Sequence, residues 1–489
     1  MKKRNLLYLL PLVFAVGCEP EFDEINFNNG TADFTRTVAL GNSLTAGYQG
    51  NALSRVGQEN SIPEILAKQF ALVGGGEFST PLLSGEAGTK GAGVDPNLFS
   101  QGILLPSLGF VSNTDCIGTT SSGPGLSSAP YSFNLAGAID PTGQVDASGF
   151  YNIDKTQGKY YNNVGVSGAR LIHLNFPSYA SANPYFGRFA LGANQTMLSY
   201  AMNVNATFFT LFIGNNDVLG YATSGGDEGG DAITDAATFA ALYAQTVDSL
   251  TKNGAKGAVS NIPSITSIPY FNTVPANAIP LSGPNTALLN AAYANYNALI
   301  EGYRAATVIT DEEAALRTIS FADGANYMLT SDPNLSALTN PTNGQPVPKL
   351  RQLKAGELVT LTLPQDSLKC AGWGTQKPVP GQFVLLKHEI ENIDNAVNSY
   401  NSSIKSIADA KGLAFVDANS KLKEVQSGLK FNGTTFTTEY VRGGSFSLDG
   451  VHPTTRGYAI IANTFIEAIN KAYNANVPQV NVNNYPTLF

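Results

Sequence analysis

The stretch "NATFFTLFIG", residues 205–214, is an almost continuous apolar run that ends at a glycine. A run of this kind is typical of a central strand in a parallel sheet, where helices cover both faces. The polar group "GNND", residues 214–217, follows it directly. Because such sheets bind ligands at the carboxyl ends of their strands, these polar residues are candidates for a functional site.

Four other segments resemble strands, and helical segments lie between them. The other strands are expected at residues 34–40, 160–169, 256–262 and 413–417. Apolar residues at helical spacing predict helices at residues 60–70, 237–254, 385–410 and 454–473. Gly254 and Gly412 are expected to end the second and third helices, and Thr454 to cap the fourth. Alternating strands and helices predict an α/β fold, a three-layer α/β/α sandwich with a five-stranded parallel sheet.

Two long stretches interrupt this pattern. Residues 74–158 are rich in Gly, Pro and Ser and show weak periodicity. Residues 263–381 are rich in Pro and Asn, with one helical stretch at residues 289–303. We interpret both as loop-rich insertions into a single domain that spans residues 33–489.

The composition indicates a globular protein and excludes one class of partner. Of the 489 residues, 43% are hydrophobic, enough to bury a large core. Charged residues make up 13%, and the formal net charge is −8. Nucleic acid is therefore not expected as a partner, because no stripe of Lys and Arg is present to neutralise phosphates.

The N-terminus has the character of a signal peptide. A basic start precedes the apolar residues 6–16, a stretch too short to span a bilayer, which needs roughly 20 apolar residues. "AVGC", residues 15–18, resembles a bacterial lipobox, which implies cleavage after residue 17 and lipidation of Cys18. The alternative is an ordinary signal peptide with an incidental cysteine.

The residues after Cys18 are acidic and are expected to form a tether over residues 18–32. Glu19, Glu21, Asp23 and Glu24 resemble the export signal of some Bacteroidota-type surface lipoproteins, although a solvated tether has the same composition. We therefore expect a lipid anchor in the bacterial outer membrane, with the protein facing the periplasm or the cell surface.

The remaining cysteines and the acidic residues point to no metal and no cofactor. Cys116 and Cys370 either pair in an oxidising compartment or remain buried thiols, and the sequence leaves both open. No Cys/His cluster has the spacing of metal ligands. Asp227, Glu228 and Asp231 lack the spacing of a calcium loop, so a flexible acidic loop is favoured.

Three residues supply the parts of a serine hydrolase. Ser43 follows the first strand in "TVALGNSLTAG", residues 37–47, although the α/β-hydrolase pattern G-x-S-x-G is broken by Thr45. His452 is a candidate base, and Asp449 lies three residues earlier, within reach of its Nδ1. Alone, Asp449 and His452 also fit a simple turn before a helix.

The other polar candidates are weaker when each is taken alone. Gly168 and Asn216 follow strands and can donate hydrogen bonds to an oxyanion, although each also fits an ordinary turn or loop. His388 is interpreted as a solvated helix residue and His173 as a structural one. The conjunction of four strand-end motifs in one chain carries more weight than any of them.

The motifs "GNSLTAG", "NNVGVSG", "GNND" and "DGVHP" together resemble the four sequence blocks of the SGNH/GDSL hydrolase family. The resemblance implies that Ser43 is the nucleophile, His452 the base and Asp449 its partner. It also implies an oxyanion hole made by the N–H groups of Ser43 and Gly168 and the side chain of Asn216. The implied fold is a flavodoxin-like sandwich with five parallel strands.

Residue 42 departs from the family pattern. The first block usually reads Gly-Asp-Ser-Leu, and Asn42 stands where the Asp is expected. Asn keeps the size and one acceptor of Asp but loses the charge. We therefore expect altered local hydrogen bonding rather than lost catalysis.

These observations predict a lipid-anchored carboxylic-ester hydrolase of the esterase/lipase kind. Its substrate is left open among acylated glycans, lipids and small esters, and the oligomeric state is not predicted. One alternative is a non-catalytic surface lipoprotein that keeps the fold to bind glycans or a partner, although no catalytic position is missing. A peptidase or acyltransferase that uses the same residues is the other alternative.

Overall fold

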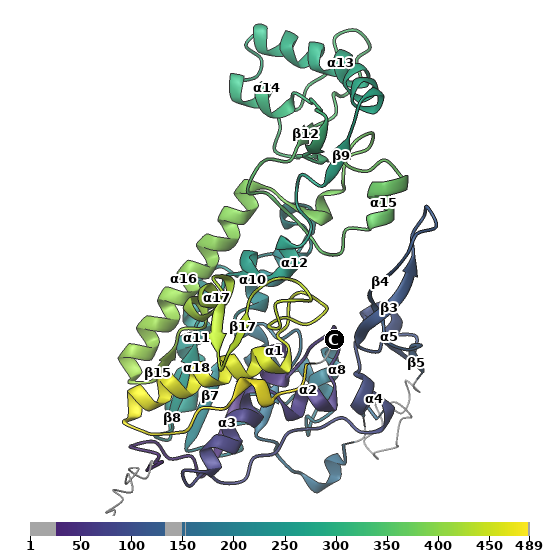
Figure 1. Cartoon of the computed structure of the whole chain (residues 1–489). Coiled ribbons are helices and arrows are strands. Elements are labelled where there is room, and N and C mark those ends of the chain that lie inside the picture. Colours follow the sequence, from purple (N-terminus) through teal and green to yellow (C-terminus); the bar gives the residue numbers. More distant parts are fainter. Residues whose placement is uncertain (1–25, 133–148, 152, 488–489) are drawn as a thin grey trace, which may run out of the picture.

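The computed structural model describes residues 26–132, 149–151 and 153–487. At its centre lies a parallel sheet with the order β15-β8-β7-β1-β6 (Figure 1). The strands are β1 (Thr37–Gly41), β6 (Asn163–Gly165), β7 (Phe208–Phe212), β8 (Lys256–Ser260) and β15 (Ala414–Val416). The five predicted parallel strands are confirmed, with the strand near residue 160 shorter than expected.

The strand order places the carboxyl ends of β1 and β7 side by side. Both pairings of β1 are parallel, with Gly41 opposite Gly165 on one side and opposite Phe212 on the other. Numbered along the chain, the strands lie in the order 2-1-3-4-5, which is common among doubly wound sheets. The order reverses beside β1, and such a switch point is where these sheets bind ligands.

Successive side chains of each strand point to opposite faces of the sheet, and the two faces pack in two different hydrophobic cores. Val38, Leu40, Phe209 and Leu211 belong to the larger core, together with residues of α9 (Met197–Met202), α11 (Ala236–Thr251) and α16 (Lys387–Lys411). Phe208 and Phe212 belong to the second core, with α3 (Ile62–Ala71) and α18 (Thr455–Tyr473). Both faces are therefore covered by helices, as the apolar run at residues 205–214 predicted.

The long helices begin and end close to the predicted residues. Gly412 ends α16 in a left-handed conformation, and Thr454 caps α18 by accepting from the N–H of Gly457. Helix α11 ends earlier than predicted, since its C-cap is Lys252 and Gly254 lies two residues beyond. The shorter elements of this part are α1 (Ser43–Ala46), α2 (Arg55–Glu59), η2 (Leu171–Asn175), α7 (Tyr179–Ala182), α8 (Pro184–Gly187), α10 (Asn216–Thr223), η3 (Gly226–Glu228), α17 (Ala418–Gln426), β16 (Leu429–Phe431), β17 (Thr434–Phe436) and η6 (Val482–Asn484).

Residues 74–158 contain more regular structure than their composition predicts. The antiparallel hairpin of β3 (Leu108–Thr114) and β4 (Thr120–Leu126) pairs seven residues on each strand. The segment also contains α4 (Gly85–Lys90), α5 (Pro96–Phe99), β2 (Ile103–Leu104), β5 (Tyr131–Ser132) and η1 (Lys155–Gln157). The expectation of a loop-rich segment is therefore wrong for the hairpin, which lies at the right of the view, away from the strands of the sheet (Figure 1).

Residues 263–381 also hold more than the one predicted helix. Helix α13 (Pro284–Ala305) covers the predicted stretch and forms a lobe with α14, β9 and β12 at the top of the view (Figure 1). The other elements of the segment and its junction are η4 (Ile265–Ser267), α12 (Pro269–Asn272), β9 (Ile279–Leu281), α14 (Asp311–Arg317), β10 (Gly324–Asn326), β11 (Leu329–Ser331), β12 (Leu350–Gln352), β13 (Leu358–Val359), α15 (Gln365–Cys370), η5 (Gly381–Phe383) and β14 (Val384–Leu385). Inside the lobe, buried Arg351 pairs with Asp332 and Glu357.

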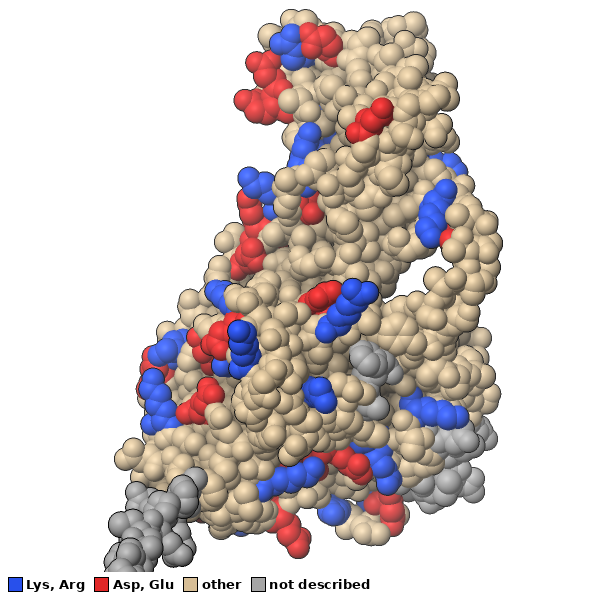
Figure 2. Space-filling model, viewed as in Figure 1, with Lys and Arg blue, Asp and Glu red and all other residues tan. Residues whose placement is uncertain are grey.

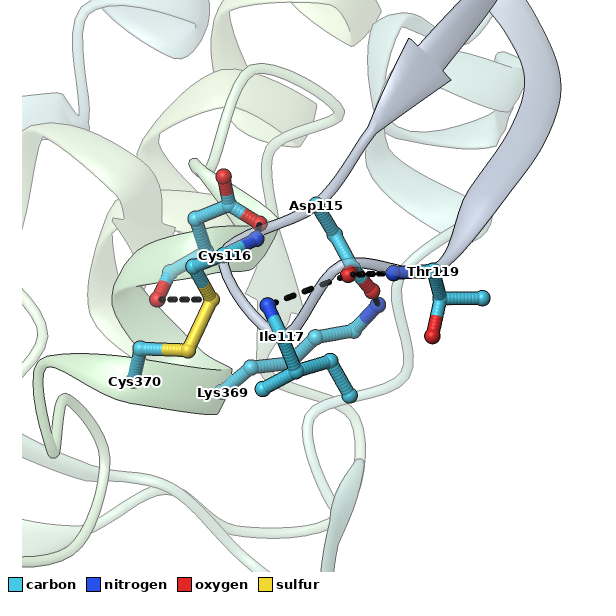
Figure 3. Close-up of a disulfide and its surroundings, with 7 residues drawn as sticks. Asp115, Cys116, Ile117, Thr119, Lys369 and Cys370 are labelled. Carbon is cyan, nitrogen blue, oxygen red and sulfur yellow. Dashed lines mark hydrogen bonds and ion pairs between the residues drawn. A yellow bond between two sulfur atoms is a disulfide. The ribbon is translucent and has the colours of Figure 1, made fainter.

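A disulfide links these two long segments. Cys116, in the turn between β3 and β4, is bonded to Cys370 at the end of α15 (Figure 3). Asp115 and Lys369 form an ion pair of 2.9 Å beside the bond. The hairpin is therefore fixed to a segment 254 residues away in the chain.

Charged side chains are scattered over the face of the molecule seen in Figure 2, and large uncharged areas lie between them. Over the residues that the structure describes, none of the helices combines the length and the apolar character needed to cross a membrane.

Candidate active site

Ser43 is held at the carboxyl end of β1 by a short capped helix. It is the first residue of α1, and Asn42 caps this helix through a hydrogen bond from the N–H of Leu44 to its Oδ1, 3.0 Å long. Gly47 ends α1 with a φ of +80°, a conformation that favours glycine. The Ser43 side chain is 5% exposed. The N–H of Ser43 lies in the first turn, where backbone donors have no partner within the helix.

His452 lies between Ser43 and Asp449. Its Nε2 is 2.9 Å from the Oγ of Ser43, and its Nδ1 is 2.9 Å from the Oδ2 of Asp449. Residues 409 positions apart in the chain therefore form one run of hydrogen bonds. The Asp449 carboxylate can only accept, so Nδ1 carries the proton and Nε2 accepts the hydroxyl proton of Ser43.

Asp449 is a strongly hydrogen-bonded carboxylate. Its Oδ1 accepts from the N–H groups of Val451 and His452, both at 2.8 Å, and its Oδ2 accepts from the N–H of Asn51 at 2.9 Å. Burial alone would raise the pKa of Asp449. The charge and hydrogen bonds of His452, with the N–H of Asn51, outweigh burial and hold the pKa at about 2. Asp449 therefore stays ionised at neutral pH and stabilises a proton on His452.

Gly168 lies in the loop after β6, and Asn216 is the first residue of α10, which follows β7. Gly168 is exposed and has a φ of +81°, which an L side chain rarely adopts. The Nδ2 of Asn216 donates to the carbonyl of Ala169 at 2.9 Å, so the side chain reaches the loop that contains Gly168. An amide NH₂ has a second hydrogen, which is available to a substrate oxygen.

Two buried residues support these loops. Asp217 accepts from the N–H of Leu171 at 2.8 Å and from the hydroxyl of Thr234 at 2.9 Å, which ties the start of α10 to the chain after Gly168. Burial raises the pKa of Asp217 to about 6, although the hydrogen bond from Leu171 opposes the shift. The Nδ2 of Asn42 donates to Asn215 Oδ1 at 3.1 Å and joins the ends of β1 and β7.

Sequence reasoning missed four residues around this site. The ring of Tyr48 lies 4.8 Å from the imidazole of His452, centroid to centroid. Ser447 donates from its hydroxyl to Asp449, Asn51 donates its backbone N–H to the same carboxylate, and Asn215 holds Asn42. Two of the four had a signal in the sequence, because Ser447 lies two residues before Asp449 and Asn215 lies inside the motif GNND.

The other two histidines have different partners. The Nδ1 of His173 accepts from the N–H of Arg170 at 3.1 Å, and its ring stacks on Tyr179 at 4.4 Å. His388, at the start of α16, contacts Asn334 at 2.9 Å and Asp227 at 3.3 Å. His173 therefore has structural contacts, and His388 is a partly exposed residue with polar neighbours.

The acidic side chains in the loop after α10 bond to different partners. Asp231 pairs with Arg170 at 2.5 Å, and Asp227 accepts from the hydroxyl of Tyr221 at 2.8 Å. Among the described residues, ligand atoms of Asp227, His388 and Glu389 lie within 4.8 Å of one another. Both oxygens of Glu389 accept backbone N–H groups, from Asp227 and Leu386, so protein donors already satisfy this carboxylate.

Two cavities meet at His452. The first, here called the α17–α18 groove, begins at Ser43, Asn216 and His452 and runs along Leu422 and Ile461. It encloses about 860 Å³, counting the part open to solvent. The second, here called the hairpin cleft, encloses about 1430 Å³ on the same measure and is lined by Leu108, Tyr270, Gln365, Tyr440 and His452, among others. In this region Figure 2 shows a hollow beside the hairpin.

Some predicted features lie outside the described residues. These are the signal peptide of residues 1–17, the lipidation site Cys18 and the acidic residues Glu19, Glu21, Asp23 and Glu24. They stay predictions from the sequence.

One family model matches part of the chain. The family model described as GDSL-like Lipase/Acylhydrolase matches residues 345–465, about a quarter of the chain. The matched residues include Asp449 and His452, whereas Ser43, Gly168 and Asn216 precede them. The match covers the last of the four motifs and supports a hydrolase of the GDSL/SGNH type. Comparisons with curated proteins and with solved structures found no significant match.

Proposed function

We propose that this protein is a serine hydrolase that cleaves carboxylic esters through an acyl-enzyme. The observation that carries the proposal is the run of hydrogen bonds from Ser43 through His452 to Asp449, with both distances at 2.9 Å. A nucleophile, its base and the group that orients the base are the parts that acyl transfer requires.

In the first half of the reaction, the Oγ of Ser43 bonds to the ester carbonyl carbon while Nε2 of His452 takes its proton. The carbonyl π electrons move to oxygen, and the N–H groups of Ser43, Gly168 and Asn216 stabilise the resulting charge. The tetrahedral adduct then collapses, the bond to the alcohol oxygen breaks, and that oxygen takes the proton from His452. The acyl group is left on Ser43.

In the second half, water replaces the alcohol. His452 removes a proton from the water as its oxygen bonds to the acyl carbon. Collapse of this second adduct returns the proton to Ser43 and releases the carboxylic acid. Asp449 stays ionised throughout and stabilises the imidazolium in both halves.

The proposal extends to the fold and to the location of the protein. The strand order 2-1-3-4-5 supports the flavodoxin-like SGNH hydrolase sandwich, with residues 74–158 and 263–381 as insertions into it. The motif ending at Cys18 supports a lipid anchor in the outer membrane. Incorporation of labelled palmitate into the wild type but not into Cys18→Ala would test the anchor.

Comparison of the wild type with Ser43→Ala on nitrophenyl acetate tests the activity. Loss of the nucleophile should lower kcat by about four orders of magnitude or more. A fluorophosphonate probe should label the wild type and leave Ser43→Ala unlabelled. Equal turnover by the two proteins, or equal labelling, would contradict the proposed mechanism.

A further inference from the structure

The α17–α18 groove is apolar along most of its length. Its walls include Leu422 and Val425 of α17, Ile460 and Ile461 of α18, and Ile265 and Ile268 near η4. Lys421 is the one Lys, Arg, Asp or Glu among the described residues that line it, and its Nζ pairs with Glu424 at 2.7 Å. A groove of this composition binds apolar groups, because burial removes their surface from water.

The catalytic groups lie at the end of the groove where α18 begins. Ser43, Asn216 and His452 contribute to the lining there, whereas Ile461 and Thr464 line it further along α18. The ester carbonyl has to lie at this end, within reach of Ser43 and of the Asn216 amide. The apolar remainder of the groove then extends away from the reacting carbon.

The hairpin cleft shares His452 with the groove but is not lined by Ser43 or Asn216. Its walls are mixed, because Leu108, Pro124 and Leu361 are apolar whereas Asn51, Thr362 and Gln365 are polar. Both cavities reach His452, whose Nε2 gives its proton to the alcohol oxygen. An acyl chain bound in the groove therefore leaves the hairpin cleft for the alcohol part of the ester.

We propose that the α17–α18 groove binds the acyl chain and that the substrates are esters of medium- and long-chain fatty acids rather than of acetate. This inference rests on the proposed esterase activity and adds its substrate class. Each methylene buried in the transition state raises kcat/KM by up to about fourfold. The gain stops at the chain length that fills the groove.

Nitrophenyl esters from acetate to decanoate, used below the concentration at which they form micelles, measure this preference. We expect kcat/KM for octanoate to exceed that for acetate by at least about tenfold. All of this turnover should disappear in Ser43→Ala. A flat profile, or one highest for acetate, overturns the acyl-chain site and leaves the esterase activity standing. Absence of Ser43-dependent turnover and of fluorophosphonate labelling overturns both.

Substitutions at Ile461 test whether the acyl chain binds in the α17–α18 groove. Ile461 is partly buried on α18, so Ile461→Phe and Ile461→Trp fill the groove step by step without replacing a fully buried residue. The ratio of octanoate to acetate turnover should fall in this order, by about tenfold for Trp. Leu288→Trp is the matched control, because Leu288 is 68% exposed on α13. A ratio unchanged in both Ile461 variants, in protein that melts like the wild type, overturns the proposed location.

Discussion

Asn42 and Asn215 hold the carboxyl ends of β1 and β7 together through a buried hydrogen bond of 3.1 Å. The Nδ2 of Asn42 donates, while its Oδ1 caps α1. An Asp at this position, as in the usual family pattern, has no N–H to donate. The sequence predicted altered local hydrogen bonding at residue 42, and the bond from Asn42 to Asn215 is such an alteration. The amide of Asn42 lies next to the nucleophile in the chain.

We predict that Asn42→Asp is tolerated and that Asn42→Ala is not. In the Asp variant the carboxylate still caps α1, and the Asn215 amide can turn over to donate to it, so the free energy of unfolding should change by about 1 kcal/mol or less. The Ala variant loses the cap and leaves Asn215 Oδ1 without its donor, which should cost about 2–3 kcal/mol. Urea unfolding and nitrophenyl acetate turnover measure both effects.

Equal damage in the two Asn42 variants would contradict this account of the amide pair. Asn215→Ala provides a second check, because it removes the partner and leaves the cap intact. Its cost should be smaller than that of Asn42→Ala.

Asp449→Asn should remove most activity with little change of structure. An amide cannot accept at every position where this carboxylate does, so His452 loses the acceptor that fixes its tautomer. We expect kcat to fall by about 10³–10⁴-fold, as for the loss of such a carboxylate in other hydrolases. Steady-state kinetics with the ester preferred by the wild type measure the fall. A loss of less than tenfold would mean that Asp449 does not orient the base.

Asp449 should also stabilise the fold in a pH-dependent way. Its pKa of about 2 in the folded protein lies below the unfolded value of about 3.9. The stabilisation is therefore complete above about pH 4 and is lost as the pH falls toward 2, by roughly 2–3 kcal/mol. Across this range the free energy of unfolding should fall by about 2–3 kcal/mol less in Asp449→Asn than in the wild type, because other carboxylates with lowered pKa values, such as Asp154 and Asp235, titrate in both proteins.

The sheet was predictable because its signal is local and repeated. Apolar runs of strand length alternate with helices whose apolar residues recur every three or four positions, so five strands and four long helices follow from the chain itself. Parallel pairing then brings the strand ends together. This is why Ser43, Gly168 and Asn216 could be grouped before any distance was known.

The features that the sequence did not predict depend on contacts between residues far apart in the chain. Strand β4 reads "TSSGPGL", which has no alternation of apolar and polar residues, and it forms because β3 pairs with it. The bond of Cys116 to Cys370 joins residues 254 positions apart, so spacing could not decide it. Tyr48 contacts His452 only through the tertiary fold, and nothing in its sequence surroundings marks that role.

The contribution of Asp217 to the free energy of unfolding should depend on pH in the opposite direction to that of Asp449. Its folded pKa of about 6 lies above the unfolded value of about 3.9, because burial disfavours the charged form. The stabilisation is therefore complete below about pH 4 and is lost as the pH rises through 6, by roughly 2–3 kcal/mol. In Asp217→Asn this loss should vanish. If the free energy of unfolding of Asp217→Asn fell between pH 4 and 6 as steeply as that of the wild type, another group would have to titrate there.

Removal of the disulfide should affect the hairpin more than the sheet. The variant Cys116→Ser/Cys370→Ser leaves no free thiol in the described part of the chain, and both positions lie outside the parallel sheet. The melting of the sheet should therefore change little, whereas proteases should cut the β3–β4 hairpin faster. Limited proteolysis followed by mass spectrometry locates the cuts.

The same double variant should change the dependence of turnover on the size of the alcohol part of the ester. Leu108 and Pro124 of the hairpin and Gln365 of α15 line the hairpin cleft, and the disulfide fixes these walls relative to one another. Turnover of esters with bulky alcohols should fall by about three- to tenfold, because binding then has to order the hairpin, while nitrophenyl acetate turnover stays close to that of the wild type. Lys369→Gln is the control, since it removes only the exposed ion pair beside the bond. Equal losses for small and bulky alcohols would mean that the disulfide supports the catalytic residues rather than the cleft.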